Sequence, residues 1–172
     1  MRPMTSAATL LLAIWMMAVP AGWAQTEKDK EHAELAAALK EVKLSLEKGL
    51  GASGREGTPI SGKYEVEHGH LQLSVYTMKG DRFSEVIVDH KTGKIAKVEA
   101  ITGGDDLAAA KAQREAMAKA KRSLGAAVGQ AVTEYAGFRA VSATPVVKDG
   151  HPVADVTLVK GAEWTTVSET LD

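Results

Sequence analysis

A twelve-residue stretch occurs twice in this chain, 81 residues apart. GHLQLSVYTMKG, residues 69–80, aligns with GHPVADVTLVKG, residues 150–161. The same spacing relates Ile60-Ser61 to Val141-Ser142, Phe83 to Trp164 and Val86 to Val167, and a spacing of 78 upstream relates Ser45-Leu46 to Ser123-Leu124. Self-similarity at a fixed spacing indicates two copies of one structural unit. The change of three residues falls between the helical and the strand part, where a loop insertion costs least.

Each copy reads as a helix followed by an antiparallel meander. In the first copy, Leu35, Leu39, Val42 and Leu46 recur at helical spacing, so one stripe of the helix is buried. Strands follow by alternation of apolar and polar residues, with glycine turns between them. We expect an α+β fold of two tandem repeats, residues 25–102 and 103–172, each a helix packed on a three- to four-stranded antiparallel meander sheet. A unit this short buries too little surface to be comfortably stable alone, so the two units should pack as one body.

The helix of the second copy is long and rich in alanine. Asp105 or Asp106, after Gly103-Gly104, is expected to cap its start. Gly125 and Gly129 lie four apart within it, which indicates either a break near Ser123 or close backbone packing on a neighbour. The sequence leaves both alternatives open.

The first 24 residues predict a secretory signal peptide. Arg2 precedes an apolar run from Ala7 to Val19, and the small-x-small triplet Gly22-Trp23-Ala24 follows it. The alternative, a membrane anchor, is disfavoured because the run is shorter than the roughly 20 apolar residues that span a bilayer. We expect cleavage after Ala24 and a periplasmic or secreted protein without a membrane span.

Composition narrows the function classes. The chain has no cysteine, which removes thiol nucleophiles, thiolate metal sites and lipobox acylation. After residue 24 it carries 20 Lys and Arg against 22 Asp and Glu, with the signs interleaved, so no nucleic acid partner is indicated. GLGASG, residues 49–54, fits G-x-G-x-x-G but follows a helix, which favours a flexible loop over a dinucleotide site. No catalytic motif is present, and we expect a protein that is not an enzyme and has no cofactor.

A metal site is the alternative that the histidines raise. His68 and His70 flank Gly69, and two such imidazoles can reach copper, zinc or nickel, with His90 or His151 completing a site. The repeat favours a hairpin turn instead, because it matches His68 with Asp149. Calcium or a lanthanide would need convergent carboxylates, and the candidates are dispersed in sequence: Asp81, Glu85, Asp105 and Asp106.

Two aromatic residues, Phe83 and Trp164, occupy the same repeat position at the start of a strand. Core packing is the default role for such residues. If one sheet face is exposed, they are candidate partner anchors, with Trp164 the first choice.

The segment VIVDHKTGKI resembles the PepSY family, whose third strand ends in Asp, two residues, Thr-Gly, Lys and an aliphatic residue. Here these are Asp89, Thr92, Gly93, Lys94 and Ile95. The resemblance covers residues 30–101 with this signature, and residues 105–172 only through the repeat.

The PepSY resemblance implies an α+β fold and an exported or membrane-associated location. Members occur in propeptides of thermolysin-like peptidases, where they look like inhibitory or folding modules, and as stand-alone periplasmic proteins, some reported to bind metal ions. The function expected is therefore a periplasmic PepSY-type interaction module that binds a periplasmic protein, inhibits a peptidase or regulates an envelope system. The alternative is a periplasmic metal-binding protein. Fold resemblance alone does not establish either.

Overall fold

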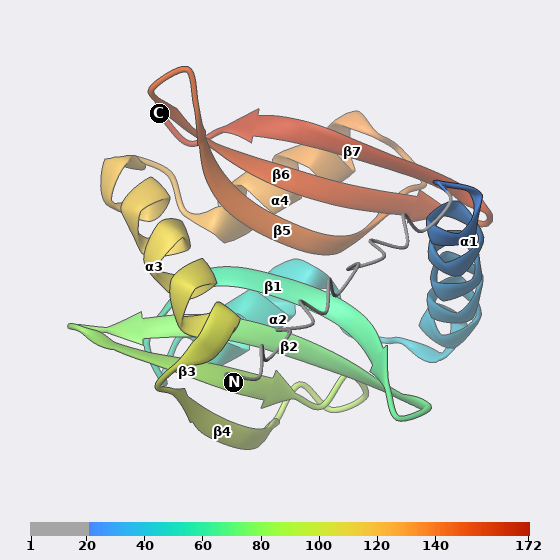
Figure 1. Cartoon of the computed structure of the whole chain (residues 1–172), viewed down its shortest axis with the longest axis horizontal. Coiled ribbons are helices and arrows are strands. Elements are labelled where there is room, and N and C mark those ends of the chain that lie inside the picture. The colour runs from blue at the N-terminus through green and yellow to red at the C-terminus, as the bar shows by residue number, and fades with distance from the viewer. Residues whose placement is uncertain (1–20) are drawn as a thin grey trace, which may run out of the picture.

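The computed structural model describes residues 21–172, with side chains from Thr26 on, as a mixed α+β fold (Figure 1). Most of the predicted signal peptide, residues 1–20, lies outside the described residues. The helices are α1 (Ala21–Ala38), η1 (Leu39–Glu41, a 3-10 turn), α2 (Leu46–Ser53), α3 (Gly104–Lys119) and α4 (Leu124–Glu134). The strands are β1 (Thr58–Glu67), β2 (His70–Lys79), β3 (Arg82–Val88), β4 (Ile95–Ile101), β5 (Arg139–Lys148), β6 (His151–Lys160) and β7 (Glu163–Thr170). Among these helices, none is both long and apolar enough to cross a membrane.

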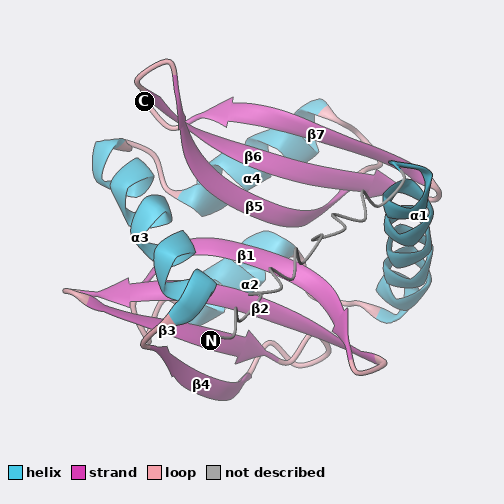
Figure 2. Cartoon of the chain, viewed as in Figure 1, coloured by secondary structure: helices cyan, strands magenta, loops and turns pink. Residues whose placement is uncertain are grey.

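The seven strands form one antiparallel sheet in the order β4-β3-β2-β1-β5-β6-β7 (Figure 2). Each half is a meander, of four strands in β1–β4 and three in β5–β7. The halves meet where β1 pairs with β5, through Gly62 opposite Ala143 and Lys63 opposite Ser142. Sequence patterning predicts the meanders but not the junction, which pairs two strand edges that would otherwise be exposed.

Irregularities of the sheet recur at the spacing of the sequence repeat. β1 has a bulge between Pro59 and Ser61 against β2, and β5 has one between Ala140 and Ser142 against β6. Each hairpin that follows has a two-residue turn with positive φ at both positions: 50° and 78° at His68-Gly69, 51° and 85° at Asp149-Gly150. These angles are typical of type I′ turns, so the predicted hairpin at both places is confirmed.

The prediction of one continuous helix through Leu35 and Leu46 is wrong. α1 ends at Ala38, the 3-10 turn η1 follows it directly, and Val42 has an extended backbone. A new helix, α2, then begins behind Ser45, whose Oγ accepts a hydrogen bond from Lys48 N at 3.4 Å. A serine whose side chain accepts a hydrogen bond from the backbone of the following turn favours the N-cap position over the interior of a helix. Here this cap starts a new helix, although the apolar residues keep helical spacing across the break.

The second helix also breaks, at residues 120–123, and Ser123 Oγ caps α4 by accepting from Ala126 N at 3.2 Å. The helix therefore breaks near Ser123, and the glycines do not serve close packing on a neighbour, because a Cβ added at Gly125 or Gly129 would meet nothing within 4 Å. The predicted aspartate cap of the first segment is wrong: Gly103 is the N-cap of α3, and Asp105 and Asp106 lie in its first turn. There their charge still interacts favourably with the helix dipole.

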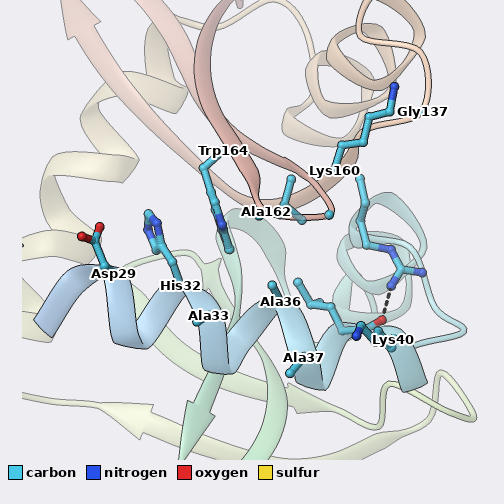
Figure 3. Close-up of a pocket in the computed structure, with 14 residues that line it drawn as sticks. Asp29, His32, Ala33, Ala36, Ala37, Lys40, Gly137, Lys160, Ala162 and Trp164 are labelled. Atoms are coloured by element: carbon cyan, nitrogen blue, oxygen red, sulfur yellow. Dashed lines mark hydrogen bonds between the residues drawn. The ribbon is translucent and has the colours of Figure 1, made fainter. Parts of the chain in front are cut away.

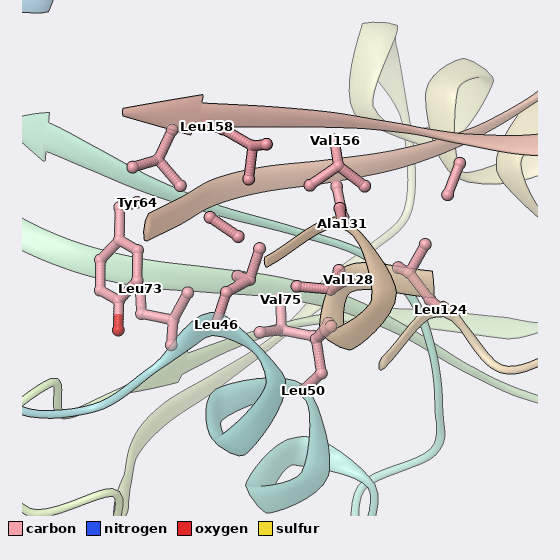
Figure 4. Close-up of a cluster of buried hydrophobic side chains, with 14 of the residues drawn as sticks. Leu46, Leu50, Tyr64, Leu73, Val75, Leu124, Val128, Ala131, Val156 and Leu158 are labelled. Carbon is pink, nitrogen blue, oxygen red and sulfur yellow. The ribbon is translucent and has the colours of Figure 1, made fainter. Parts of the chain in front are cut away.

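The main core lies between the sheet and the helices α2 and α4, which pack side by side on one face (Figure 4). Its largest fully buried side chains include Leu46, Leu124 and Val128 from the helices and Leu73, Val75, Val156 and Leu158 from the strands. α3 lies in front of the sheet, on the side opposite α2 and α4, and α1 stands beside the β6–β7 turn (Figure 1). The two outer helices leave a cavity at each end of the sheet.

Candidate functional site

The first cavity lies between α1 and the β6–β7 hairpin and has a volume of about 760 Å³ (Figure 3). α1 contributes one wall, which includes Ala33 and Ala36. The hairpin contributes Lys160 to Ala162 and then Trp164, and the α4–β5 connection contributes Gly137. The walls are mainly apolar, with lysine side chains among the lining residues, which is the composition of a recognition pocket.

Trp164 is held by stacking on a helix side chain. The His32 and Trp164 rings lie with centroids 4.0 Å apart and planes inclined by 15°. Figure 3 shows both side chains above α1, with Trp164 next to Ala162. Trp164 is partly buried and still lines the cavity. Its indole is therefore oriented before any ligand arrives, the property of an anchor residue.

Arg139 ties the cavity to the first half of the chain. Its guanidinium donates to the carbonyl oxygens of Leu39 at 2.7 Å and Val42 at 2.8 Å. The first of these bonds is the dashed line in Figure 3. Both carbonyls lie where the helical segment ends: the Leu39 carbonyl also accepts from Val42 N at 3.2 Å, and the Val42 carbonyl lies beyond the last helical turn. A charged donor from β5 therefore fixes the exit of α1.

A second cavity, of about 820 Å³, lies between α3 and the β2–β3 hairpin. Its walls correspond to those of the first cavity at the spacings of the repeat. Lys79 corresponds to Lys160, Phe83 to Trp164, Glu56 to Gly137 and Leu107 to Asp29. In addition, Ala100, Ile101 and Thr102 from the end of β4 line the second cavity, and the first has no counterpart of them in the described chain.

The two cavities differ in what covers the aromatic residue. In the second, Arg114 makes an ion pair with Asp81 at 3.1 Å and lies over the Phe83 ring, 5.4 Å from its centroid. The corresponding residues of the first cavity are Ala36 and Ala162, which are too small to cover an indole, so His32 is the side chain that stacks on Trp164 there. The ion pair whose arginine lies over the aromatic ring at one site is thus replaced by two alanines at the other.

Phe83 is therefore not available as a partner anchor, and that prediction is corrected. Its side chain is only 4 % exposed and forms a small core cluster with Ile60 and Ala110. The helix α3 supplies both Ala110, which packs in this cluster, and Arg114, which lies over the ring. Both predicted anchors line a cavity, but only Trp164 is more than marginally exposed.

The histidines of the metal hypothesis lie on exposed turns. His68 and His70 are both exposed at the β1–β2 turn. His151 lies at the β5–β6 turn, where its Nδ1 is 3.0 Å from Asp172 Oδ2. β1 and β5 are antiparallel neighbours, so these two turns lie at opposite ends of the sheet (Figure 1). His151 thus cannot complete a site with His68 and His70, whose binding of a metal stays a prediction.

The dispersed carboxylates do not converge either. Asp81 pairs with Arg114, and Glu85 accepts a short hydrogen bond from the Ser74 hydroxyl. Asp106 accepts from the Tyr76 hydroxyl at 2.6 Å. Burial of the phenol, and then this hydrogen bond, raise the pKa of Tyr76. Among the side chains described from Thr26 on, no group of three or more His, Asp or Glu could hold a metal ion.

The PepSY-like signature builds a turn between β3 and β4. Asp89 Oδ1 accepts from the amides of Lys91 and Thr92, both at 2.8 Å. The Asp89 carbonyl accepts from Gly93 N at 2.8 Å, and Gly93 has a φ of 71°. These backbone donors lower the pKa of the Asp89 carboxyl. The signature residues thus have a structural role in directing the chain into β4.

Sequence reasoning identified Trp164 but missed the walls around it. The signal was present in the repeat: Ala36 and Ala162 stand where the other copy has Arg114 and Asp81. A comparison of the copies position by position, at both spacings, would have found this difference.

Comparison with protein-family models, with curated proteins and with solved structures finds no match for this chain.

Proposed function

We propose that this protein is an exported binding module made of two tandem PepSY-like repeats, and that it binds a periplasmic protein through the cavity beside Trp164. The observation that carries the proposal is that the ion pair whose arginine lies over the aromatic ring in one cavity is replaced by alanines in the other. A preoriented indole beside an open, mainly apolar pocket suits an apolar side chain of a partner.

The repeat assignment is supported by details that lie at the same spacing in both halves. The serine caps at Ser45 and Ser123 are 78 residues apart. The carbonyl of His90 accepts from Leu44 N at 3.2 Å, and the carbonyl of Leu171 accepts from Arg122 N at 3.1 Å, which are the corresponding positions. Shared hydrogen bonds at irregular positions are hard to explain by a common fold class alone.

The chemistry of the site favours recognition over catalysis. His32 is engaged by stacking on Trp164, and Arg139 by two backbone carbonyls. The PepSY resemblance suggests a peptidase or an envelope protein of the same compartment as the partner. Such a module would act by occupying a surface of that protein.

The test closes access to the Trp164 ring with the chain's own ion pair. The double variant Ala36→Arg with Ala162→Asp copies Arg114 and Asp81 into the Trp164 cavity. The protein is expressed with its leader, recovered after export, and checked by intact mass for a chain that begins at Gln25. We expect the wild type to capture a partner from a periplasmic extract and the closed variant to lose it while unfolding at an unchanged urea midpoint.

A control variant places a charge elsewhere on the surface. Val98 is 44 % exposed on β4, and Val98→Arg should leave capture unchanged. Equal capture by the closed variant and the wild type would contradict the proposal, as would a product that retains its first 24 residues inside the cell.

A further inference from the structure

We propose that the outer edge of β7 takes up an extended segment of the partner protein as an additional antiparallel strand, in the place that β4 holds beside β3. The inference rests on the proposed function and names how the partner enters the Trp164 cavity. β7 and β3 correspond at the 81-residue spacing. β3 is paired on both sides, by β2 and β4, whereas β7 is paired by β6 alone within residues 21–172.

Between its two glutamates, Glu163 and Glu169, the edge of β7 lacks the devices that usually protect an exposed strand. Residues 163–170, EWTTVSET, contain no lysine, arginine or proline, and the pairing of β6 with β7 has no bulge. β4, at the opposite edge, carries Lys97 in an ion pair with Glu99 at 2.8 Å and has a register irregularity near Ile95. Charged side chains and bulges discourage pairing with another chain. β7 is therefore the edge that can accept a strand.

The β3–β4 pairing shows which side chains the incoming strand needs. Ile101 pairs with Phe83 and packs in that residue's cluster, and Val98 pairs with Val86. The corresponding residues of β7 are Trp164 and Val167. A partner segment in the same register would place one aliphatic residue beside Val167 and another, three residues later, beside Trp164.

The cavity supplies an independent reason for that second residue. Ala100, Ile101 and Thr102 line the cavity beside Phe83, and residues 21–172 provide nothing in their place beside Trp164. An aliphatic side chain at the position of Ile101 would enter between Trp164 and α1. Strand addition gives affinity through backbone hydrogen bonds, and such a pocket gives specificity. The partner segment is thus an extended one with an aliphatic-x-x-aliphatic pattern.

The test uses the chain's own β4 as the probe. The peptide KIAKVEAIT, residues 94–102, has the required pattern. Since the chain has no cysteine, a single Thr166→Cys on β7 reacts only at the intended edge. By the β3–β4 register, Glu85 pairs with Glu99, so Thr166 should face the Glu99 position of the peptide. Disulfide formation is compared for peptides with cysteine at that position and at the Lys97 position, one same-face step away.

We expect several-fold more cross-linking at the Glu99 position than at the Lys97 position. Facing residues of an antiparallel ladder alternate between hydrogen-bonded and non-hydrogen-bonded pairs, and the two kinds of pair differ in the distance between their side chains. A second matched pair, Thr165→Cys with cysteine at the Ala100 position, is therefore tested, so that both kinds of pair are represented. Replacing the valine and the second isoleucine of the peptide by aspartate should abolish the preference. Trp164 is the only tryptophan after residue 24, so its emission should shift to the blue when the matched peptide binds.

Equal yields in both registers, or no adduct at all, would overturn the inference. So would a disulfide-linked dimer of the protein in place of the adduct, because the edge would then serve self-association. The two proposals fail separately. If the closed variant loses partner capture but no register-specific cross-link forms, the proposed binding module stands and strand addition is rejected. If the closed variant still captures the partner, the proposed binding site itself is rejected.

Discussion

Replacing Arg139 with methionine should loosen the junction between α1 and the rest of the fold. The guanidinium donates to two carbonyls at the end of the first helical segment, and methionine keeps the length of the side chain but donates nothing. The Leu39 carbonyl would then keep only the Val42 amide as a donor, and the Val42 carbonyl would depend on water. We expect the Trp164 cavity to be affected directly, because its α1 wall is fixed by these bonds.

The size of the effect follows from the two hydrogen bonds. A bond to a charged group contributes about 1.5–3 kcal/mol, so two give about 3 kcal/mol at the low end. The site is half-exposed and the freed carbonyls can bind water, so we expect a loss of about 2 kcal/mol in the free energy of unfolding. With a urea m-value of about 2 kcal/mol/M, typical of a chain this size, the midpoint should fall by about 1 M.

The assay is urea unfolding of residues 25–172 followed by Trp164 emission. Before the transition, Arg139→Met should already show a red-shifted spectrum, because a mobile α1 no longer shields the indole. Lys40→Met is the matched control, an exposed cation from the same cavity whose replacement should leave midpoint and spectrum unchanged. A midpoint shift below about 0.2 M for Arg139→Met would refute the role assigned to the guanidinium.

Three further predictions concern local structure, and chemical denaturation tests each of them. Gly49→Ala should destabilise the fold by about 1 kcal/mol or more, because the new Cβ would lie 2.1 Å from Cδ2 of buried Leu73. Gly51→Ala in the same helix is the control: its Cβ has open space, so the free energy of unfolding should rise by up to about 1 kcal/mol. Glu169 is 6 % exposed, and burial is the first cause that raises the pKa of its carboxyl. The native state therefore binds a proton more readily than the unfolded state, so stability should fall as the pH rises from the usual glutamate pKa through the raised one. Glu169→Gln should remove this pH dependence and stabilise the protein at pH 7 but not at acid pH. Asp149→Val should cost roughly 1–2 kcal/mol because of the positive φ, while Asp149→Asn stays near neutral; equal stability of the two would contradict the turn assignment.

The PepSY-like signature and the proposed binding site lie in different parts of the molecule. The signature turn at Asp89–Gly93 leads the chain into β4, which fills the edge of β3. The second half has no such turn within the described residues, and its corresponding edge is where we place the partner strand. In this proposal the first half shows, within one chain, the arrangement that the second half forms with another protein.

Tyr64 illustrates how the first half is held together without a disulfide. Its hydroxyl donates to the Leu44 carbonyl at 2.7 Å, and burial raises the pKa of the phenol to about 12. The bond joins β1 to the segment between η1 and α2. A buried hydroxyl with a backbone partner satisfies its polar group and fixes the helix-to-helix connection.

The sequence by itself determined the strands, their order within each meander and the hairpin turns. Alternation and turn chemistry are local properties, so His68-Gly69 and Asp149-Gly150 could be assigned from the letters alone. The helix breaks at Ser45 and Ser123 were harder, since apolar spacing continues across them while the serine caps end the helix. Trp164 could be selected as a candidate from its place in the repeat.

Only the tertiary structure decided which surfaces meet. The pairing of β1 with β5 makes one sheet of two meanders, and nothing local specifies it. That arrangement sets α3 over Phe83 and α1 beside Trp164, so of two residues at the same repeat position one is buried and the other stays partly exposed. The physical reason is that burial depends on contacts between segments far apart in the chain, whereas periodicity and turn preference depend only on neighbours.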